Sequence, residues 1–353
     1  MSDIKHERPG VYSAYDASTV VTAGHGTKTV GVAAKAVQGT VGVAVTVTGY
    51  TAGLSAFGED TTPGMSSILR LLFANGTATV VAVRVADDGA LSNYQAAFDV
   101  LAKYDMQIVV CDSADITVQQ ALRDAVEDAS KQRKERIAVV GGHGETAAKL
   151  VEHAAELDSE RMVLVGPDAL DSNGDTLAGV FAAAAVAGVI SQGGDPAVPL
   201  NGAELSGLGG LSEDYSDNDI DLLVRGGVTP LESVAGVISP VRGITTRTTT
   251  GGVTDTTWRE LTTILIVDDI IPAIRASLRS RFARVKNTAR SRSAIRSQVI
   301  VELEKKVAAE VIDSYGEVSV SASEEDPTVC LVEFSFAVAH GLNQICLTVH
   351  ITV

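Results

Sequence analysis

The sequence predicts a mixed α/β fold, in which a layered α/β domain precedes a smaller α+β domain. From residue 29 to residue 165, short apolar runs typical of buried strands alternate with segments of helical periodicity, as in sheets with parallel strands. In the last third, two long amphipathic helices precede strands with period-2 alternation. We therefore expect an N-terminal arm (1–27), an α/β domain (28–242), a C-terminal core domain (243–340) and a C-terminal strand arm (341–353).

Local signals predict each element of the α/β domain. Residues 29–47 contain two β segments, the second alternating strictly between valine and smaller residues. A Pro-Gly pair at 63–64 introduces a helix over Ser66–Phe73, which Asn75–Gly76 ends. The next predicted elements are, in order, strand Thr79–Val85, helix Tyr94–Leu101, strand Gln107–Cys111, helix Val118–Lys131, strand Ile137–Val140, helix Glu145–Leu157 and strand Met162–Val165.

After residue 166 the alternation weakens. The Ala-rich run Leu177–Ile190 is shorter than the roughly 20 residues that cross a bilayer, so it predicts a buried helix and no membrane insertion. Residues 192–219 are rich in Gly, Asp and Ser, and a loop of this length predicts a surface feature or a domain border. The Thr- and Arg-rich run Gly243–Gly252 predicts a further strand and turn.

Two amphipathic helices dominate the C-terminal third. Apolar residues recur at helical spacing over 271–285 and again over 295–311, with a break near Lys286–Asn287. Alternation over Cys330–Val338 predicts one strand with an apolar face. A last strand has an edge that no later residue covers, so we expect it to pair with another chain. Its apolar face is formed by Ile345, Leu347, Val349, Ile351 and Val353.

Charge is segregated along the chain. The net charge of −16 excludes nucleic acid as the main partner, because phosphate binding requires a basic surface. Between residues 273 and 310, however, ten basic side chains accompany only three acidic ones. Solvated helix faces usually interleave both signs, so this stretch is either an ordinary solvated face or a docking surface for an acidic partner. The candidate docking residues are Arg275, Arg279, Arg284, Arg290, Arg292 and Arg296.

No pattern indicates metal or covalent chemistry. The cysteines, Cys111, Cys330 and Cys346, lack metal-ligand spacing and lie in apolar runs, so we expect small core residues. The six histidines are scattered, with no paired carboxylate at catalytic spacing. We expect no metal, no cofactor and no catalytic residue. The first ten residues lack the apolar segment of a secretory signal, which predicts synthesis in the cytoplasm.

One glycine-rich turn supports an alternative function. Gly141–Gly144 follows a predicted strand and precedes a predicted helix, where a helix N-terminus can bind phosphate. The turn lacks the GxGxxG pattern and a following Lys-Ser/Thr pair, so we interpret it as an ordinary strand-to-helix turn. A cytosolic nucleotide-binding α/β enzyme that uses this turn is the alternative.

Several motifs resemble those of contractile tail sheath proteins. Pro9-Gly10-Val11-Tyr12 is similar to the P-G-V-Y element of that family. Phe57-Gly58, the segment Leu72–Gly76 and the strand Val80–Val85 are similar to its F-G, f-F-x-N-G and v-v-R-V sequence. Residues 226–230 with 240–248 resemble its Gly-rich stretch leading to G-A-R-T, although the Trp-Gly pair that usually precedes the Arg-Thr is missing.

The resemblance implies a structural protein and not an enzyme. Sheaths of phage tails, R-type bacteriocins and related injection systems polymerise helically around an inner tube and contract by rotation of rigid subunits. Here it implies an outer α/β domain, a C-terminal core domain around the tube, and arms that exchange strands between copies through Gly10, Val11 and Tyr12 and through Ile345–Val353. The six arginines would face the tube.

The same resemblance implies the partners and the location. Besides further copies of the chain and the inner tube protein, these are baseplate and tail terminator proteins. The chain would be made in the bacterial cytoplasm and become part of a phage tail or of a released extracellular particle. A different helical structural protein, such as a tube or filament subunit, is a third possibility.

Overall fold

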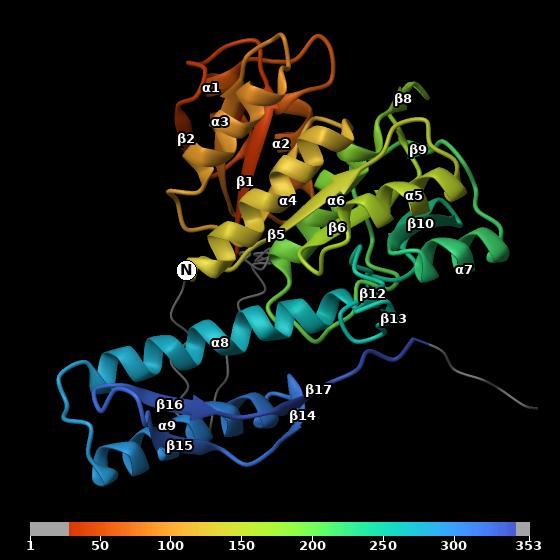
Figure 1. Ribbon diagram of the computed structural model, residues 1–353. Coiled ribbons are helices and arrows are strands. Elements are labelled where there is room, and N and C mark those ends of the chain that lie inside the picture. Colours follow the sequence, from red (N-terminus) through yellow and green to blue (C-terminus); the bar gives the residue numbers. More distant parts are fainter. Residues whose placement is uncertain (1–27, 344–353) are drawn as a thin grey trace, which may run out of the picture.

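An eight-stranded sheet forms the centre of residues 28–242, which we call the α/β unit (Figure 1). The computed structural model describes residues 28–343, so the predicted arm residues Gly10–Tyr12 and Ile345–Val353 lie outside the described residues. The six central strands are parallel, and an antiparallel strand closes each edge. The strand order is β11 (Val237–Pro240), β10 (Val228–Val234), β6 (Met162–Gly166), β5 (Ile137–Gly141), β4 (Ile108–Cys111), β1 (Thr29–Lys35), β3 (Thr79–Val85) and β2 (Ala44–Val47).

Helices cover both faces of this sheet, which explains the continuous apolar runs of its strands. One face packs against α1 (Tyr50–Phe57), α2 (Met65–Ala74) and α6 (Gly179–Gln192). The other packs against α3 (Leu91–Leu101), α4 (Ile116–Lys131), α5 (Ala147–Leu157) and α7 (Asp217–Arg225). Twelve of the fourteen residues of α6 are buried, so the prediction of a buried Ala-rich helix is confirmed.

The structure confirms the α/β class and adds elements that the sequence pattern did not predict. Helices α1 and α7 and the strands β10 and β11 are new. The Gly-rich region 192–219 includes β9 (Gly210–Leu211), which joins β7 (Ala169–Leu170) and β8 (Thr176–Leu177) in a small separate sheet. In the part of the chain that the structure describes, no helix is long and apolar enough to span a membrane.

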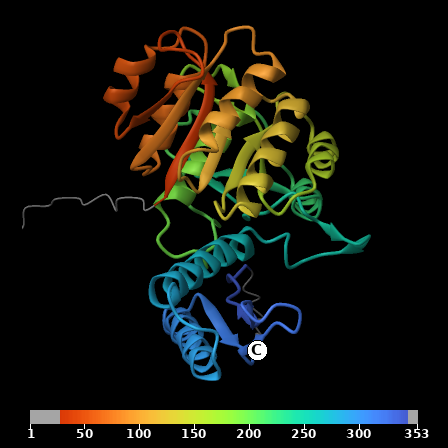
Figure 2. The same cartoon turned by 60° about the vertical axis from the view of Figure 1, so that its left-hand side comes forward.

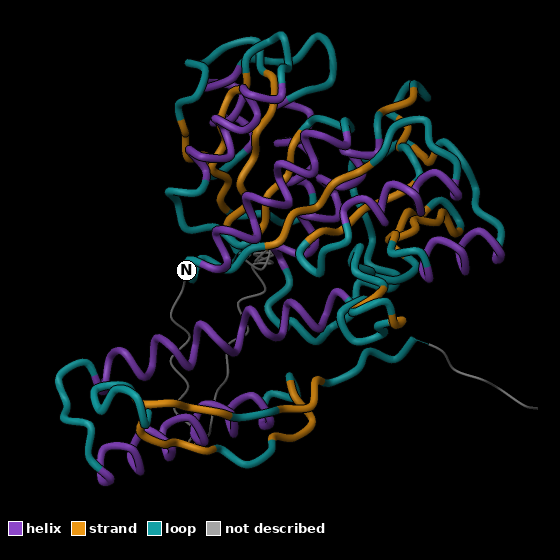
Figure 3. The backbone as a smooth tube through the Cα atoms, viewed as in Figure 1, coloured by secondary structure: helices purple, strands orange, loops and turns teal. Residues whose placement is uncertain are grey.

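Residues 243–343, which we call the C-terminal unit, place two helices beside a two-stranded ribbon (Figure 3). A short hairpin of β12 (Thr249–Thr250) and β13 (Val253–Thr254) leads into α8 (Leu261–Phe282) and α9 (Ala289–Ala308). The ribbon pairs β14 (Ile312–Tyr315) with β17 (Phe336–Val338), and β15 (Ser319–Ala322) with β16 (Cys330–Glu333). The helices and the ribbon share a small core of eight buried side chains.

The prediction of one strand over Cys330–Val338 is wrong. The segment forms β16 and β17, which pair with different strands. The ribbon is interrupted where the N–H of Gly316 donates to the carbonyl oxygen of Ser335 at 2.8 Å. A Cβ at Gly316 would lie 2.4 Å from the Ser335 hydroxyl. The two sides of the ribbon therefore approach each other too closely at this point for regular pairing of larger residues.

Helix α8 joins the two units, as Figure 2 shows from a second side. Its first turns place Leu261 and Ile264 in the α/β core, whereas its later residues enter the small C-terminal core. Ion pairs cross the joint, among them Arg161 with Asp268 at 2.8 Å. Burial raises the pKa of Asp268 despite the adjacent guanidinium. The pair therefore adds little net stability, but losing one partner would leave an uncompensated buried charge.

Candidate assembly interface

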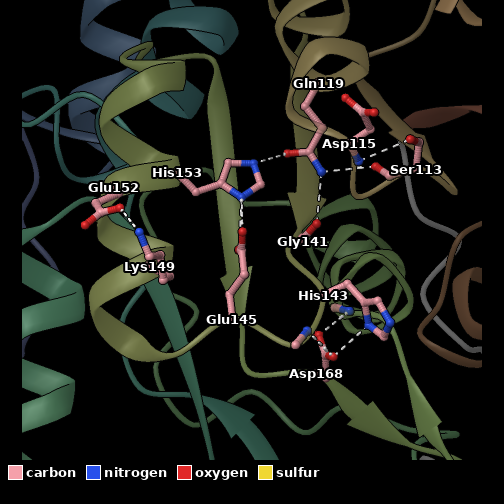
Figure 4. A network of polar contacts seen from close by, with 12 residues as sticks. Ser113, Asp115, Gln119, Gly141, His143, Glu145, Lys149, Glu152, His153 and Asp168 are labelled. Atoms are coloured by element: carbon pink, nitrogen blue, oxygen red, sulfur yellow. Dashed lines mark hydrogen bonds and ion pairs between the residues drawn. The ribbon is translucent and has the colours of Figure 1, made fainter.

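Protein atoms fill the glycine-rich turn after β5. The Asp168 carboxylate, 7% exposed, accepts hydrogen bonds of 2.8 Å from the N–H groups of Gly144 and Gly179 (Figure 4). It also lies 2.9 Å from Nδ1 of His143. A side chain on Gly141 would come within 2.1 Å of the Gly179 main chain. Close packing of α6 therefore explains the glycine, and a carboxylate lies where a phosphate would bind.

A second polar network holds α5 against α4 behind this turn. The amide nitrogen of Gln119 donates to the carbonyl oxygens of Ser113 and Gly141, at 3.0 and 2.9 Å. The buried ring of His153 lies between the amide oxygen of Gln119, at 2.9 Å, and the carboxylate of Glu145, at 3.0 Å. These contacts fix the turn and the helix to the sheet, which is a structural role.

At the edge of the sheet where an α/β enzyme would bind its ligand, the carboxylates are likewise hydrogen-bonded to the protein itself. Such ligands bind beyond the carboxyl ends of the strands where the strand order reverses, here a pocket of about 520 Å³ beside β1, β3 and β4. Its Asp112 carboxylate accepts from the N–H of Lys35 and the hydroxyl of Tyr94, and burial raises its pKa. Asp60 accepts from the N–H groups of Gly64 and Ser67. Across residues 28–343, no cluster of three His, Cys, Asp or Glu side chains could hold a metal ion.

Three of the six predicted docking arginines are engaged within the molecule. All three fasten an α8 or α9 side chain to a neighbouring segment, so they stabilise the C-terminal unit or its joint with the α/β unit. The contacts are Arg275 with Glu135 at 2.7 Å, Arg292 with the Asn287 side chain at 2.9 Å, and Arg296 with the carbonyl oxygen of Val318 at 2.7 Å.

The other three, Arg279, Arg284 and Arg290, are exposed around the connection between α8 and α9. In the described residues none of them forms an ion pair or a side-chain hydrogen bond, and the same holds for the neighbouring Arg281 and Lys286. We call these five residues the basic tip. It lies at the end of the C-terminal unit that is far from β12 and β13 (Figure 1). The structure thus brings half of the predicted arginines to one exposed site.

The ribbon offers a second kind of interface. Each of its strands has a single partner among the described residues, so main-chain N–H and C=O groups line both outer edges. Exposed apolar side chains lie beside one of these edges: Val329, directly before β16, is 40% exposed, and Leu331 in β16 is 46% exposed. Such an edge can accept an additional strand.

Comparison with known proteins identifies this architecture. Residues 91–246 match the phage tail sheath protein central domain, and residues 253–352 match the phage tail sheath C-terminal domain. The chain belongs to the phage tail sheath family. This is a family of structural proteins, so the chain is not an enzyme, and the enzyme alternative built on Gly141–Gly144 is not supported.

Individual relatives agree with the family. The tail sheath protein of Bacillus phage SP01 is 29% identical over 253 residues, which cover 70% of this chain and 43% of that protein. The chain thus matches less than half the length of this curated relative.

Solved structures share the fold. The anti-feeding prophage helical sheath in its contracted state has a TM-score of 0.72 at 17% identity, with 98% of this chain and 99% of that chain covered. The sheath tail protein of Desulfitobacterium hafniense has a TM-score of 0.70 at 12% identity, with 93% and 100% covered.

Proposed function

We propose that this chain is the subunit of a contractile tail sheath, which polymerises helically around an inner tube and contracts by rigid-body rotation of its subunits. The unpaired edges of the ribbon carry the proposal, because they are open to strands from other copies. Residues 28–242 would form the outer domain and residues 243–340 the inner one. Family membership supports this function.

Strand exchange would link the subunits. The predicted arms, Gly10–Tyr12 and Ile345–Val353, have the β-prone and alternating sequences of added strands. A ladder of main-chain hydrogen bonds is maintained while rigid units rotate, because the connecting segments absorb the change in direction. Copies would therefore stay joined when the lattice changes from the extended to the contracted form.

The basic tip would hold the tube in the extended particle. Arg279, Arg284 and Arg290 are free to meet carboxylates on a tube protein, and each exposed pair contributes only about 0–1 kcal/mol. Many such weak contacts together hold the sheath on the tube, and each can break when the subunits rotate. The baseplate and tail terminator proteins would contact the two ends of the helix.

Electron microscopy of the purified chain in negative stain tests polymerisation, and hollow striated tubes are the expected result. Removal of residues 345–353 should leave soluble subunits, because the added strand is lost. A matched pair separates strand pairing from a general effect: Leu347→Lys with Val349→Lys alters the apolar face, whereas Thr348→Lys with His350→Lys alters the other face. Normal tubes from the truncated chain would refute strand exchange.

Co-sedimentation with the inner tube protein tests the tip. Arg279→Glu, Arg284→Glu and Arg290→Glu together should abolish binding, because three attractive contacts become repulsive. The control reverses Lys131 and Lys149, two exposed cations of the α/β unit. Undiminished binding of the triple variant would assign the tube contact to another surface.

A further inference from the structure

A groove opens at the basic tip, where α8, α9 and the turn between β15 and β16 meet. Its volume is about 510 Å³. Phe282, Val285 and Ile295 form the main apolar part of its lining, and Lys286, Asn287, Ser291 and Thr328 form the polar part. Val285 is 52% exposed. The Asn287 amide fixes the groove, because it donates to the carbonyl oxygens of Pro327, at 2.8 Å, and of Val329, at 3.2 Å. A preformed apolar groove with a polar rim is the usual site of an anchoring side chain in a protein interface.

Opposite charges flank this groove on its two sides. Lys286 lines the helix side, where further exposed cations are sequence neighbours of the lining residues, and exposed carboxylates directly precede the lining residue Pro327 on the ribbon side. An occupant with a matching order of charges, carboxylates first, an apolar side chain in the middle and a cation last, would satisfy both sides in one orientation only. The cations are Arg281, Arg284, Lys286 and Arg290, and the carboxylates are Glu324, Glu325 and Asp326.

Helix α7 presents this order of charges at the opposite end of the molecule. Asp217 and Asp221 are exposed, Leu222 is 44% exposed, and the Arg225 side chain is 75% exposed at the end of the helix. The nine residues of α7 span about 14 Å, a length that suits an occupant of one groove. The Asp221 to Arg225 ion pair, at 3.0 Å, is solvent-exposed and costs little to exchange for new partners.

We propose that α7 of one copy docks into the tip groove of a second copy. Leu222 would enter the groove between Phe282, Val285 and Ile295, and the α7 carboxylates of Asp217 and Asp221 would face the cations on the helix side. Arg225 would face the turn between β15 and β16. Figure 1 shows α7 and the α8–α9 connection on opposite sides of the molecule, so the contact joins different copies. A contact between two different surfaces repeats from copy to copy and builds rings or helices.

This contact deepens the proposed function, on which its place in a sheath rests. The tip holds one partner at a time, so docking of α7 competes with the tube. Subunit rotation that separates the tip from the tube would make the groove available to the neighbouring copy. The tip would then contribute to the surface that the contracted lattice buries.

A charge exchange tests the contact in the full chain, with sedimentation velocity for self-association and negative stain for particle shape. Arg284→Glu with Arg290→Glu, and separately Asp217→Lys with Asp221→Lys, should each raise the concentration needed for self-association by about tenfold or more. The four substitutions together should return it to within about threefold of the original, because the attraction is restored with its sign inverted.

The apolar anchor is tested without changing the rim. Leu222→Asp or Val285→Asp should weaken self-association by about thirtyfold, because each places a charge in a desolvated contact. Val301→Asp is the control, since Val301 is 47% exposed on α9 and does not line the groove. Melting curves identify any variant that fails to fold. If Leu222→Asp or Val285→Asp does not fold, the other of the two tests the apolar contact.

Two results would overturn the proposal. One is that both double variants, the Arg284 and Arg290 reversal and the Asp217 and Asp221 reversal, self-associate at the original concentration. This result overturns the proposal even if the Arg284 and Arg290 reversal loses binding to the tube protein. The other is failure of the four-fold variant to recover. Charge-dependent oligomers that never form striated tubes would instead support the contact and contradict the sheath function.

Discussion

The two units of this protein differ in charge and in packing. In residues 28–242, 28 acidic side chains accompany 14 basic ones, whereas residues 243–343 are nearly balanced, with 13 acidic and 12 basic side chains. The α/β unit is packed on both faces of its sheet, whereas the C-terminal unit has a core of eight buried side chains and a ribbon with open edges. The difference suggests a rigid acidic unit carried on a smaller unit that is built for attachment.

The largest expected effect is a cavity in the rigid unit. Leu72→Ala in α2 removes a fully buried side chain and should lower the free energy of unfolding by about 2–5 kcal/mol. Val301→Ala, at a half-exposed position of α9, should change it by less than about 0.5 kcal/mol. Denaturant titrations of both variants measure the two values. Equal losses would contradict the contrast in packing.

The joint between the units should show the next largest effect. Asp268→Asn leaves the Arg161 guanidinium without its charged partner, and we expect a loss of about 3 kcal/mol. Scanning calorimetry should show one transition for the natural chain and two for the variant, because α8 then couples the units less tightly. The double change Arg161→Met with Asp268→Leu should recover most of the stability. A single unshifted transition in Asp268→Asn would show that the ion pair does not hold the joint.

A smaller effect is expected at the N-cap of α4. The Asp115 carboxylate accepts hydrogen bonds of 2.7 Å from the hydroxyl and the N–H of Thr117, and these bonds lower its pKa. Asp115→Ala should cost about 1 kcal/mol at neutral pH. A carboxylate whose pKa is lowered by folding stabilises the folded state at pH values above the ordinary aspartate pKa of about 4. This stabilisation is lost as the pH falls through the pKa of the folded state. The difference in free energy of unfolding between the natural chain and Asp115→Ala should therefore shrink below about pH 4. Denaturant titrations from pH 7 to pH 2.5 measure it, and a constant difference over this range would contradict this account.

Cysteine reactivity compares the units without altering stability. Burial raises the pKa of Cys111, in β4, to about 12, whereas Cys330 in the ribbon is half-buried. In a Cys346→Ser background, a thiol reagent at pH 8 should modify Cys330 at least about tenfold faster than Cys111, because burial suppresses the Cys111 thiolate and shields that sulfur from the reagent. Peptide mapping over time gives both rates. Equal rates would mean that β4 opens as readily as the ribbon.

Elements with a strong apolar period were predictable from the sequence, and contacts between distant residues were not. The predicted helix Ser66–Phe73 differs by one residue at each end from α2, and strand Thr79–Val85 coincides with β3. Helix α1 begins after Gly49, which offers no side-chain cap. Helix α7 carries a capping box, Ser216 with Asp219, which could have predicted it.

The candidate interface was predictable only in part. The arginine-rich stretch indicated a docking surface, but the engagement of Arg275 depends on Glu135, 140 positions away in the sequence. No local pattern reveals such a pairing. The groove depends similarly on Asn287 meeting the turn between β15 and β16, about 40 residues later.

Electron cryomicroscopy of particles assembled from the purified chain tests the central claim most directly. A helical reconstruction should show a hollow tube with the C-terminal unit on the inner wall, the α/β unit outside, and the ribbon of each copy extended by a strand from another. A reconstruction with the α/β unit lining the lumen, or with every ribbon edge unpaired, would contradict the account.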